Sequence, residues 1–407
     1  MSGETYGSNG LVIFVFGLLF LPILLPLVGA SSGWEEDGWL DADWFTKDGR
    51  IASGDELGCQ GMPTLNLELM PKTTAMECKK YLMDRTNASR WSDYPLSFGI
   101  DLSENPNFDS NDHEALFEEG FAVHGLDTNF ENTAWHNGTD VPITDSDWWN
   151  LGSSGSLEQK ITPLDEIIEL ANQGAMVNLQ WQAQIADLKV RTNGELVSWL
   201  ESQNAWYTTW GEAYSYDFHQ SNDVFLISFE DTNKWKITNS GPGIENQNTL
   251  AWDVPITHGI EIKNNTVIDV SSGADELNEL SIQNKTLTPG WRQDGDLVWI
   301  TLHSGQDAII TLENDSEIKF SNNSPRYFNN HSWALTISGH HTIDLFKWSM
   351  KFDESPLVFT WLVEPQEVED FSWVLIIIAA SAGIGAVTYT RHLLTKDREE
   401  RGIYESE

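Results

Sequence analysis

The sequence predicts an α+β membrane-distal region at residues 34–219, an all-β sandwich or jelly-roll-like region at 222–364, and a single transmembrane helix at 371–390. Three observations support this fold class. The first region mixes the apolar periodicity of helices with the alternation of strands. The second region consists of short apolar runs separated by polar turns, which is typical of β-structure. An uncharged apolar segment of membrane-spanning length follows it. A chain of 407 residues is long enough for two domains and membrane segments.

The N-terminal segment, residues 1–30, is predicted to be either a signal peptide or an N-terminal anchor. Leu11–Val28 carries no charge, and the small residues at 29–32 are typical of a signal-peptidase site after Ala30. No Lys or Arg precedes the apolar run, however, and its length approaches the ~20 residues of a membrane-spanning helix. Both interpretations remain open, and both involve export.

The segment at 371–390 has no charged side chain and is about long enough to cross ~30 Å of hydrocarbon. An acidic stalk at 365–370 precedes it and a basic cytoplasmic tail at 391–407 follows. The positive-inside rule therefore predicts a single-pass protein of the cell membrane with its body outside. The alternative is a buried core helix. Small residues four apart, such as Ala379 and Gly383, also allow helix self-association.

Local signals in the first region favour an α+β layer over a doubly wound sheet. A capping-box pattern at 74–77 predicts one helix, and a second is predicted from Thr162 to Gly174. Apolar and polar residues then alternate over 177–185, which predicts a half-buried strand. A hairpin turn at 193–194 leads into a predicted strand at 196–199.

The second region shows almost no helical period, and its spacing is typical of an antiparallel sandwich or jelly roll. The predicted strands are 224–229, 235–238, 259–263, 266–270, 297–302, 308–312, 317–320, 333–337, 343–350 and 357–363.

The net charge of −39 argues against nucleic acid as a partner, because such a surface repels phosphate backbones. It is consistent with a well-solvated acidic surface or with cation binding. No GxSxG, HExxH, Walker A or GxGxxG motif occurs, so the sequence indicates no catalytic centre or organic cofactor.

The chain has two cysteines, Cys59 and Cys78, which predict one disulfide in an exported protein, with free buried thiols as the alternative. Sequons predict a glycosylated and therefore exposed surface. The sequon asparagines are Asn87, Asn137, Asn264, Asn284, Asn314, Asn322 and Asn330.

A run of short oxygen-bearing side chains suggests a calcium loop, since Ca²⁺ takes about six to eight oxygen ligands. The alternative is a solvated turn, and no Gly occupies the position that an EF-hand requires. The candidate ligands are Asp101, Asn105, Asn107, Asp109 and Asp112. Four histidines raise a second hypothesis, a transition-metal site, with exposed turn residues as the alternative. They are His303, His331, His340 and His341.

Aromatic residues lie close to carboxylates between residues 199 and 217. Trp199, Trp206 and Trp210 are candidates for stacking on sugar rings, and Glu212 with Asp217 for binding hydroxyls or cleaving a glycosidic bond. The alternative is that these aromatic side chains simply form core.

The leading hypothesis from the sequence is a non-enzymatic surface protein for binding, adhesion or envelope structure, with glycans or envelope proteins as partners. Two alternatives are a tethered carbohydrate-active enzyme resembling a glycoside hydrolase and an accessory subunit of a membrane complex. A single deep cleft lined by two carboxylates would be the most informative feature of the folded surface.

Overall fold

A computed structural model describes residues 49–101, 104–125, 148–157, 162–182, 194–241, 250–322, 325–340, 349–365 and 373–404. The chain divides into two compact units. One is Asp37–Gln366, and the other combines Met1–Glu36 with Glu367–Glu407.

A curled, half-barrel-like parallel sheet lies at the centre of the Asp37–Gln366 unit. Eight strands follow the order β4-β3-β2-β1-β18-β17-β6-β5, and β7 pairs with the amino end of β17. The strands are β1 (Glu56–Cys59), β2 (Ser97–Gly99), β3 (Val123–Gly125), β4 (Trp149–Leu151), β5 (Gly155–Ser156), β6 (Met176–Gln182), β7 (Trp206–Tyr207), β17 (Ala334–His340) and β18 (Thr360–Val363).

Helices connect these strands, because a parallel pair needs a crossover. Helix α3 contacts β1 and α4, α5 contacts β6, and α7 contacts β3 and the later strand β10 (Ile256–Glu261). The helices of this part are α2 (Arg50–Ser53), α3 (Pro71–Met83), α4 (Ser110–Glu118), α5 (Leu164–Asn172), α6 (Glu195–Ser202) and α7 (Trp210–Asn222).

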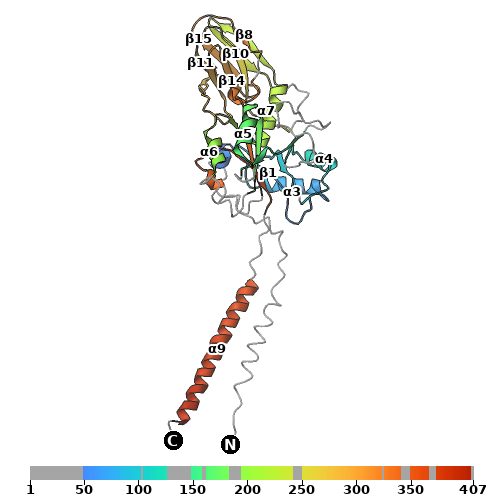
Figure 1. Cartoon of the computed structure of the whole chain (residues 1–407), viewed down its shortest axis with the longest axis vertical. Helices are drawn as coiled ribbons and strands as arrows, with labels where there is room; N and C mark the ends of the chain where they lie inside the picture. Colours follow the sequence, from blue (N-terminus) through green and yellow to red (C-terminus); the bar gives the residue numbers. More distant parts are fainter. Residues whose placement is uncertain are drawn as a thin grey trace. The chain divides into compact units, whose positions relative to one another are not determined.

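Two antiparallel sheets are inserted between α7 and β17, with the orders β13-β14-β10-β16 and β12-β11-β15-β9-β8. They share one hydrophobic cluster that includes Ile237, Ile260 and Ile310. Figure 1 shows these strands gathered at one end of the body. The strands are β8 (Phe225–Asp231), β9 (Lys234–Asn239), β10 (Ile256–Glu261), β11 (Val267–Ser272), β12 (Asp275–Glu276), β13 (Gly290–Asp294), β14 (Leu297–Leu302), β15 (Asp307–Leu312) and β16 (Lys319–Phe320).

Several predicted elements are present. The helix predicted at Thr162–Gly174 is α5, and the strand predicted at 177–185 is β6, whose described part ends at Gln182. The strands predicted between 224 and 320 correspond to antiparallel strands. The segment 341–348, which covers most of one further predicted strand, lies outside the described residues.

The predicted fold class is nevertheless wrong. The first region is built on a parallel α/β sheet, and the predicted strand at 196–199 lies within helix α6. The runs at 333–337 and 357–363, which were assigned to the antiparallel region, form β17 and β18 of the parallel sheet. The reason is that a short apolar run does not specify its partner strand, which is chosen by contacts distant in sequence. The burial of every residue in β17 and β18, which is typical of parallel strands, is seen only in the fold.

The predicted transmembrane helix is also corrected. Helix α9 (Trp373–Tyr404) runs past the predicted end at residue 390. In the part of the chain that the structure describes, no helix is long and apolar enough to cross a membrane. Described side chains of α9 span residues 380–396, where Arg391 and Lys396 shorten the apolar stretch. The side chains of 371–379 lie outside that part, as do residues 1–30 and 366–370.

Buried polar groups fasten α7 to the sheet. Glu56, the first residue of β1, is fully buried, and its Oε2 accepts the Gly211 N–H at 2.8 Å while Oε1 accepts the Ser97 hydroxyl. Burial raises the pKa of Glu56 to about 7; these hydrogen bonds oppose the rise, and the charge of Glu212 adds to it. Gly125 provides room for α7, because a Cβ there would lie 2.1 Å from the Trp210 ring.

The raised pKa predicts a pH dependence of stability. Between pH 4.5 and about 7 the native state retains a proton on Glu56 that the unfolded chain releases, so stability falls as the pH rises through this window. In the wild type we expect the unfolding free energy to fall by on the order of 3 kcal/mol across this window, and in Glu56→Gln we expect this fall to be absent. Urea denaturation at several pH values measures both. The exposed Glu276→Gln should keep the wild-type profile. An unchanged slope in Glu56→Gln would contradict the prediction.

Candidate functional site

A cleft of about 140 Å³ lies at the carboxyl edge of the parallel sheet. Its residues follow three adjacent strands: Gln60 follows β1, Asp101 follows β2, and Glu364 follows β18. In parallel α/β sheets the loops at the carboxyl ends of the strands form the ligand and active sites. This cleft is therefore our candidate site.

The polar lining of the cleft consists of carboxylates and amides. The carboxylates are Asp101, Glu104 and Glu364, the amides come from Gln60, Asn66 and Asn105, and the lining includes no Lys or Arg. Met62, Leu65 and Leu67 supply the apolar part. Such a lining presents acceptors to hydroxyl or ammonium groups and repels anions.

The predicted disulfide is confirmed, and it fixes one wall of the cleft. Cys59 is the last residue of β1 and Cys78 lies on α3; their sulfur atoms are 2.08 Å apart, and both residues are fully buried. Gln60 follows Cys59 directly, so the bond joins the two ends of the loop that forms the wall. Because this wall is already ordered, ligand binding would cost less conformational entropy.

The predicted calcium ligands have different positions. Asp101 and Asn105 line the cleft, whereas Asp109 and Asp112 form the capping box of α4. Asp109 Oδ1 accepts the Asn111 N–H at 2.8 Å, and Asp112 Oδ2 accepts the Asp109 N–H at 2.9 Å.

The backbone N–H of Asn107 donates to Glu68 Oε1 at 2.5 Å. Within the described ranges, no group of three His, Cys, Asp or Glu residues is placed to hold a metal ion. Calcium binding stays a prediction.

The aromatic candidates lie mainly in the core. Trp206 and Trp210 are 1% and 0% exposed, so a ligand in solution cannot reach them. Trp199 is half-buried and stacks on Trp333, with ring centroids 5.8 Å apart. These positions agree with the core alternative for Trp206 and Trp210.

The two candidate carboxylates of α7 do not line the cleft. Glu212 is 2% exposed, and its Oε2 accepts from Arg90 Nη2 at 2.8 Å and from Trp91 Nε1 at 2.6 Å. Its Oε1 accepts from the Thr208 hydroxyl at 3.0 Å. Asp217, by contrast, is exposed. Glu212 therefore serves as a buried hydrogen-bond acceptor.

The four candidate histidines do not converge in the described part of the chain. His331 Nε2 bonds the Asn284 carbonyl at 3.0 Å, His303 Nδ1 pairs with Asp253 Oδ1 at 3.6 Å, and His340 is buried at the end of β17. His341 lies outside the described residues.

Sequence reasoning missed a buried histidine pair that fixes α4 to β3. His113 Nδ1 and His124 Nδ1 are 2.8 Å apart, and His124 Nε2 lies 2.9 Å from the Phe121 carbonyl. Burial and the neighbouring His113 lower the pKa of His124 well below 6.5. Because the Phe121 carbonyl can only accept, a neutral His124 donates through Nε2, and its Nδ1 accepts the proton on His113 Nδ1.

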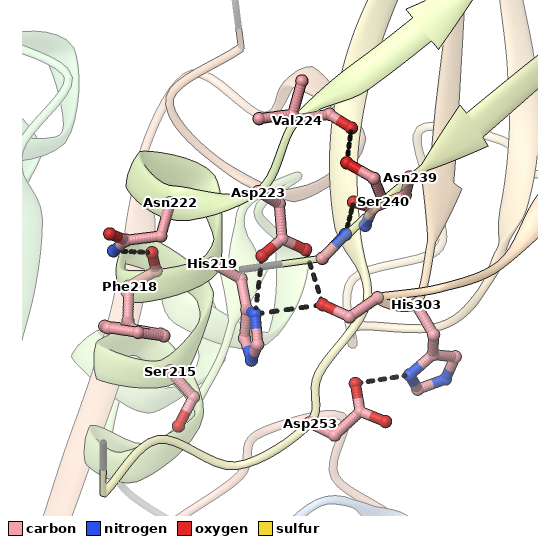
Figure 2. A network of polar contacts seen from close by, with 12 residues as sticks. Ser215, Phe218, His219, Asn222, Asp223, Val224, Asn239, Ser240, Asp253 and His303 are labelled. Carbon is pink, nitrogen blue, oxygen red and sulfur yellow. Dashed lines mark hydrogen bonds and ion pairs between the residues drawn. The ribbon is translucent and has the colours of Figure 1, made fainter. Parts of the chain in front are cut away.

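Sequence reasoning also missed a network of His219, Asp223 and Ser304 between α7 and the turn after β14 (Figure 2). These are the residue types of a catalytic triad, but the geometry differs. Ser304 Oγ and Asp223 Oδ1 both approach His219 Nδ1, at 3.1 and 3.0 Å, and Nε2 faces the Trp252 carbonyl at 2.9 Å. A triad needs the serine and the carboxylate on opposite ring nitrogens, so this histidine does not activate Ser304.

The network has a structural role instead. Nδ1 faces Asp223 and Nε2 faces a carbonyl, so the doubly protonated imidazolium satisfies both, while the Ser304 hydroxyl donates to Asp223 Oδ2 at 2.5 Å. Burial alone would lower the pKa of His219. Asp223, the Trp252 carbonyl and Asp253 outweigh burial and raise the pKa above 6.5.

Comparisons with protein-family models, with curated proteins and with solved structures found no match for this chain.

The His219 network predicts a second pH dependence. Because the native pKa lies above the unfolded value of 6.5, its contribution to stability is complete below about pH 6.5 and is lost as the pH rises through the native pKa. We expect His219→Gln to lower the unfolding free energy by about 2 kcal/mol at pH 6 and to flatten this loss. His303→Gln, which breaks a pair that is partly exposed, is the control. The same pH slope in His219→Gln and wild type would refute this role.

The disulfide predicts a matched pair of stability losses. Cys59→Ser and Cys78→Ser should each lower the unfolding free energy by about 3 kcal/mol, because the loop they close spans 19 positions, and the double variant should lose little more. Urea denaturation measures the loss after peptide mass spectrometry has verified the bond in the wild type. Single variants that unfold like wild type would show that the bond does not stabilise the fold.

Proposed function

We propose that the chain is an exported, non-enzymatic binding protein whose ligand site is the cleft at the carboxyl edge of the parallel sheet. The observation that carries the proposal is the meeting of Gln60, Asp101 and Glu364 from three adjacent strands in one cleft. The disulfide is consistent with an oxidising compartment outside the cytoplasm.

Hydroxyl-rich ligands, and above all saccharides, fit the chemistry of this cleft. Its carboxylates accept hydrogen bonds from hydroxyls, its amides both donate and accept, and the half-buried Leu65 offers contact to the apolar face of a ring. The volume of about 140 Å³ is small, so the cleft suits one terminal sugar rather than a long chain.

A glycan array followed by titration calorimetry on the full-length protein tests this function. We expect Asp101→Asn and Glu364→Gln each to weaken binding about tenfold or more, because each removes a charged acceptor. Asp275→Asn and Glu276→Gln on the exposed strand β12 are matched controls and should bind as wild type does. Equal binding by cleft and control variants would exclude the cleft, and no binding to any glycan would exclude saccharides.

A second candidate function is cleavage of a glycosidic bond in the same cleft. It is favoured by a specific observation, the presence of Asp101 and Glu364 in one cleft, since glycoside hydrolysis uses two carboxylates. Release of reducing sugar that Asp101→Asn or Glu364→Gln abolishes would support the enzyme. Binding without release of reducing sugar would favour the binding protein over the enzyme.

A further inference from the structure

A second hollow, of about 470 Å³, lies at the amino edge of the parallel sheet. Three segments form it: α2, the residues before β18, and the turn at 281–287 between β12 and β13. Its volume is within the range of small-ligand pockets. The sequon residues Asn284, Lys285 and Thr286 are part of its lining.

The turn that carries Asn284 is held in place from several sides. The Tyr207 N–H donates to the Lys285 carbonyl at 2.7 Å, and Arg90 Nη2 donates to the Leu287 carbonyl at 2.8 Å. Lys285 Nζ donates to the Glu201 carbonyl at 3.0 Å. The turn is thus a rigid wall of the hollow.

Asn284 itself is exposed, and its hydrogen bonds orient its amide. Its Oδ1 accepts from the Ser281 N–H at 2.8 Å and from the Ser281 hydroxyl at 3.2 Å, and its carbonyl bonds His331. In the described part of the chain its Nδ2 makes no hydrogen bond. Nδ2 is the atom that carries the sugar when an Asn-X-Thr sequon is modified.

The lining of the hollow suits a neutral sugar better than an anion. Its two cations already have protein partners: Arg50 pairs with Asp55 and the Leu357 carbonyl, and Lys285 with Glu201 and Tyr207. Thr286 supplies a hydroxyl, and the exposed Pro356 supplies apolar contact. The hydroxyls of Ser53 and Ser355 donate to the Gly49 carbonyl and to Glu201, so toward a sugar they serve as acceptors. Hydroxyls beside apolar surface match the two faces of a pyranose.

The other sequon asparagines that the structure describes do not line this hollow. Those that the structure describes are exposed but do not line it: Asn87, Asn264, Asn314, Asn322 and Asn330. Asn137 lies outside the described residues.

We propose that Asn284 carries an N-linked glycan whose first sugars occupy this hollow and cover residues 355–358. The inference depends on the proposed export, because the donor is a lipid-phosphate-linked sugar at the export membrane. Asn284 Nδ2 forms a bond to C1 of the sugar and loses one proton. The C1–O bond of the donor breaks, and the lipid phosphate leaves with its electron pair.

Two measurements on full-length protein from its natural cells test the proposal. Peptide mass spectrometry should find the glycan on Asn284. An endoglycosidase should release that glycan about tenfold more slowly from native than from unfolded protein, because the hollow shields it. The glycan of an exposed sequon such as Asn264 is the internal control and should be released equally fast from both.

Sequon variants provide the matched comparison. Thr286→Ala removes the Asn284 glycan but keeps the asparagine, and we expect hydrogen exchange of the Ser355, Leu357 and Val358 amides to become about fivefold faster. Thr266→Ala removes the Asn264 sequon and should leave exchange at 355–358 unchanged. An unmodified Asn284, equal release from native and unfolded protein, or unchanged exchange in Thr286→Ala would overturn the inference.

These outcomes also separate this inference from the proposed function. If the disulfide is intact and the cleft binds its ligand while Asn284 is unmodified, only the glycan proposal fails. If both cysteines are free thiols and every sequon is unmodified, the proposed export fails as well.

Discussion

The buried ion pair between Arg50 and Asp55 links the segment that leads into β1 to the segment that contains β18. Arg50 Nη2 lies 2.7 Å from Asp55 Oδ1, and the side chains are 3% and 0% exposed. Arg50 also donates to the Leu357 carbonyl, and Asp55 accepts from Trp361 Nε1 at 2.8 Å. Removing one partner from such a buried pair costs about 3–5 kcal/mol, because the other charge is left without compensation. The pair therefore favours the arrangement that sets β18 beside β1.

The pairing of β1 with β18 creates the candidate site. Glu56 pairs with Thr360 and Cys59 with Val363 in parallel register, so the residues after both strands emerge at the same edge. Gln60 and Glu364 thereby meet Asp101, which follows β2 on the other side of β1. Gln60 and Glu364, which are 304 positions apart in the sequence, line one cleft only because the last strand enters the middle of the sheet.

The same arrangement explains the position of the antiparallel sheets. The chain leaves the parallel sheet after α7, forms β8–β16, and returns as β17. The insertion is tied back at two places. The turn at 281–287 packs on the amino edge, and the His219 network joins α7 to the turn after β14. The first tie forms the hollow beside Asn284, and the second adds a titratable contact between the two parts of the body.

Local chemistry in the sequence was enough to predict particular elements. Pro163 and Gly174 bound α5, the alternation after residue 176 marks β6, and two cysteines in a chain that is predicted to be exported favour the Cys59–Cys78 bond. Each of these signals depends on neighbours along the chain or on simple counting. The exposure of the described sequon asparagines is likewise predicted from a local three-residue pattern.

Only the tertiary structure decided which strands pair, and therefore where the site lies. Nothing local to β17 and β18 indicates that Ala334 pairs with Met176 or Thr360 with Glu56. The sequence suggests Asp101 as a calcium ligand and places Glu364 at the end of the predicted antiparallel region. Glu212 and Asp217, adjacent in sequence to aromatic residues, do not reach the cleft. The physical reason is that strand pairing and burial are set by long-range packing, whereas sequence patterns report only on local periodicity.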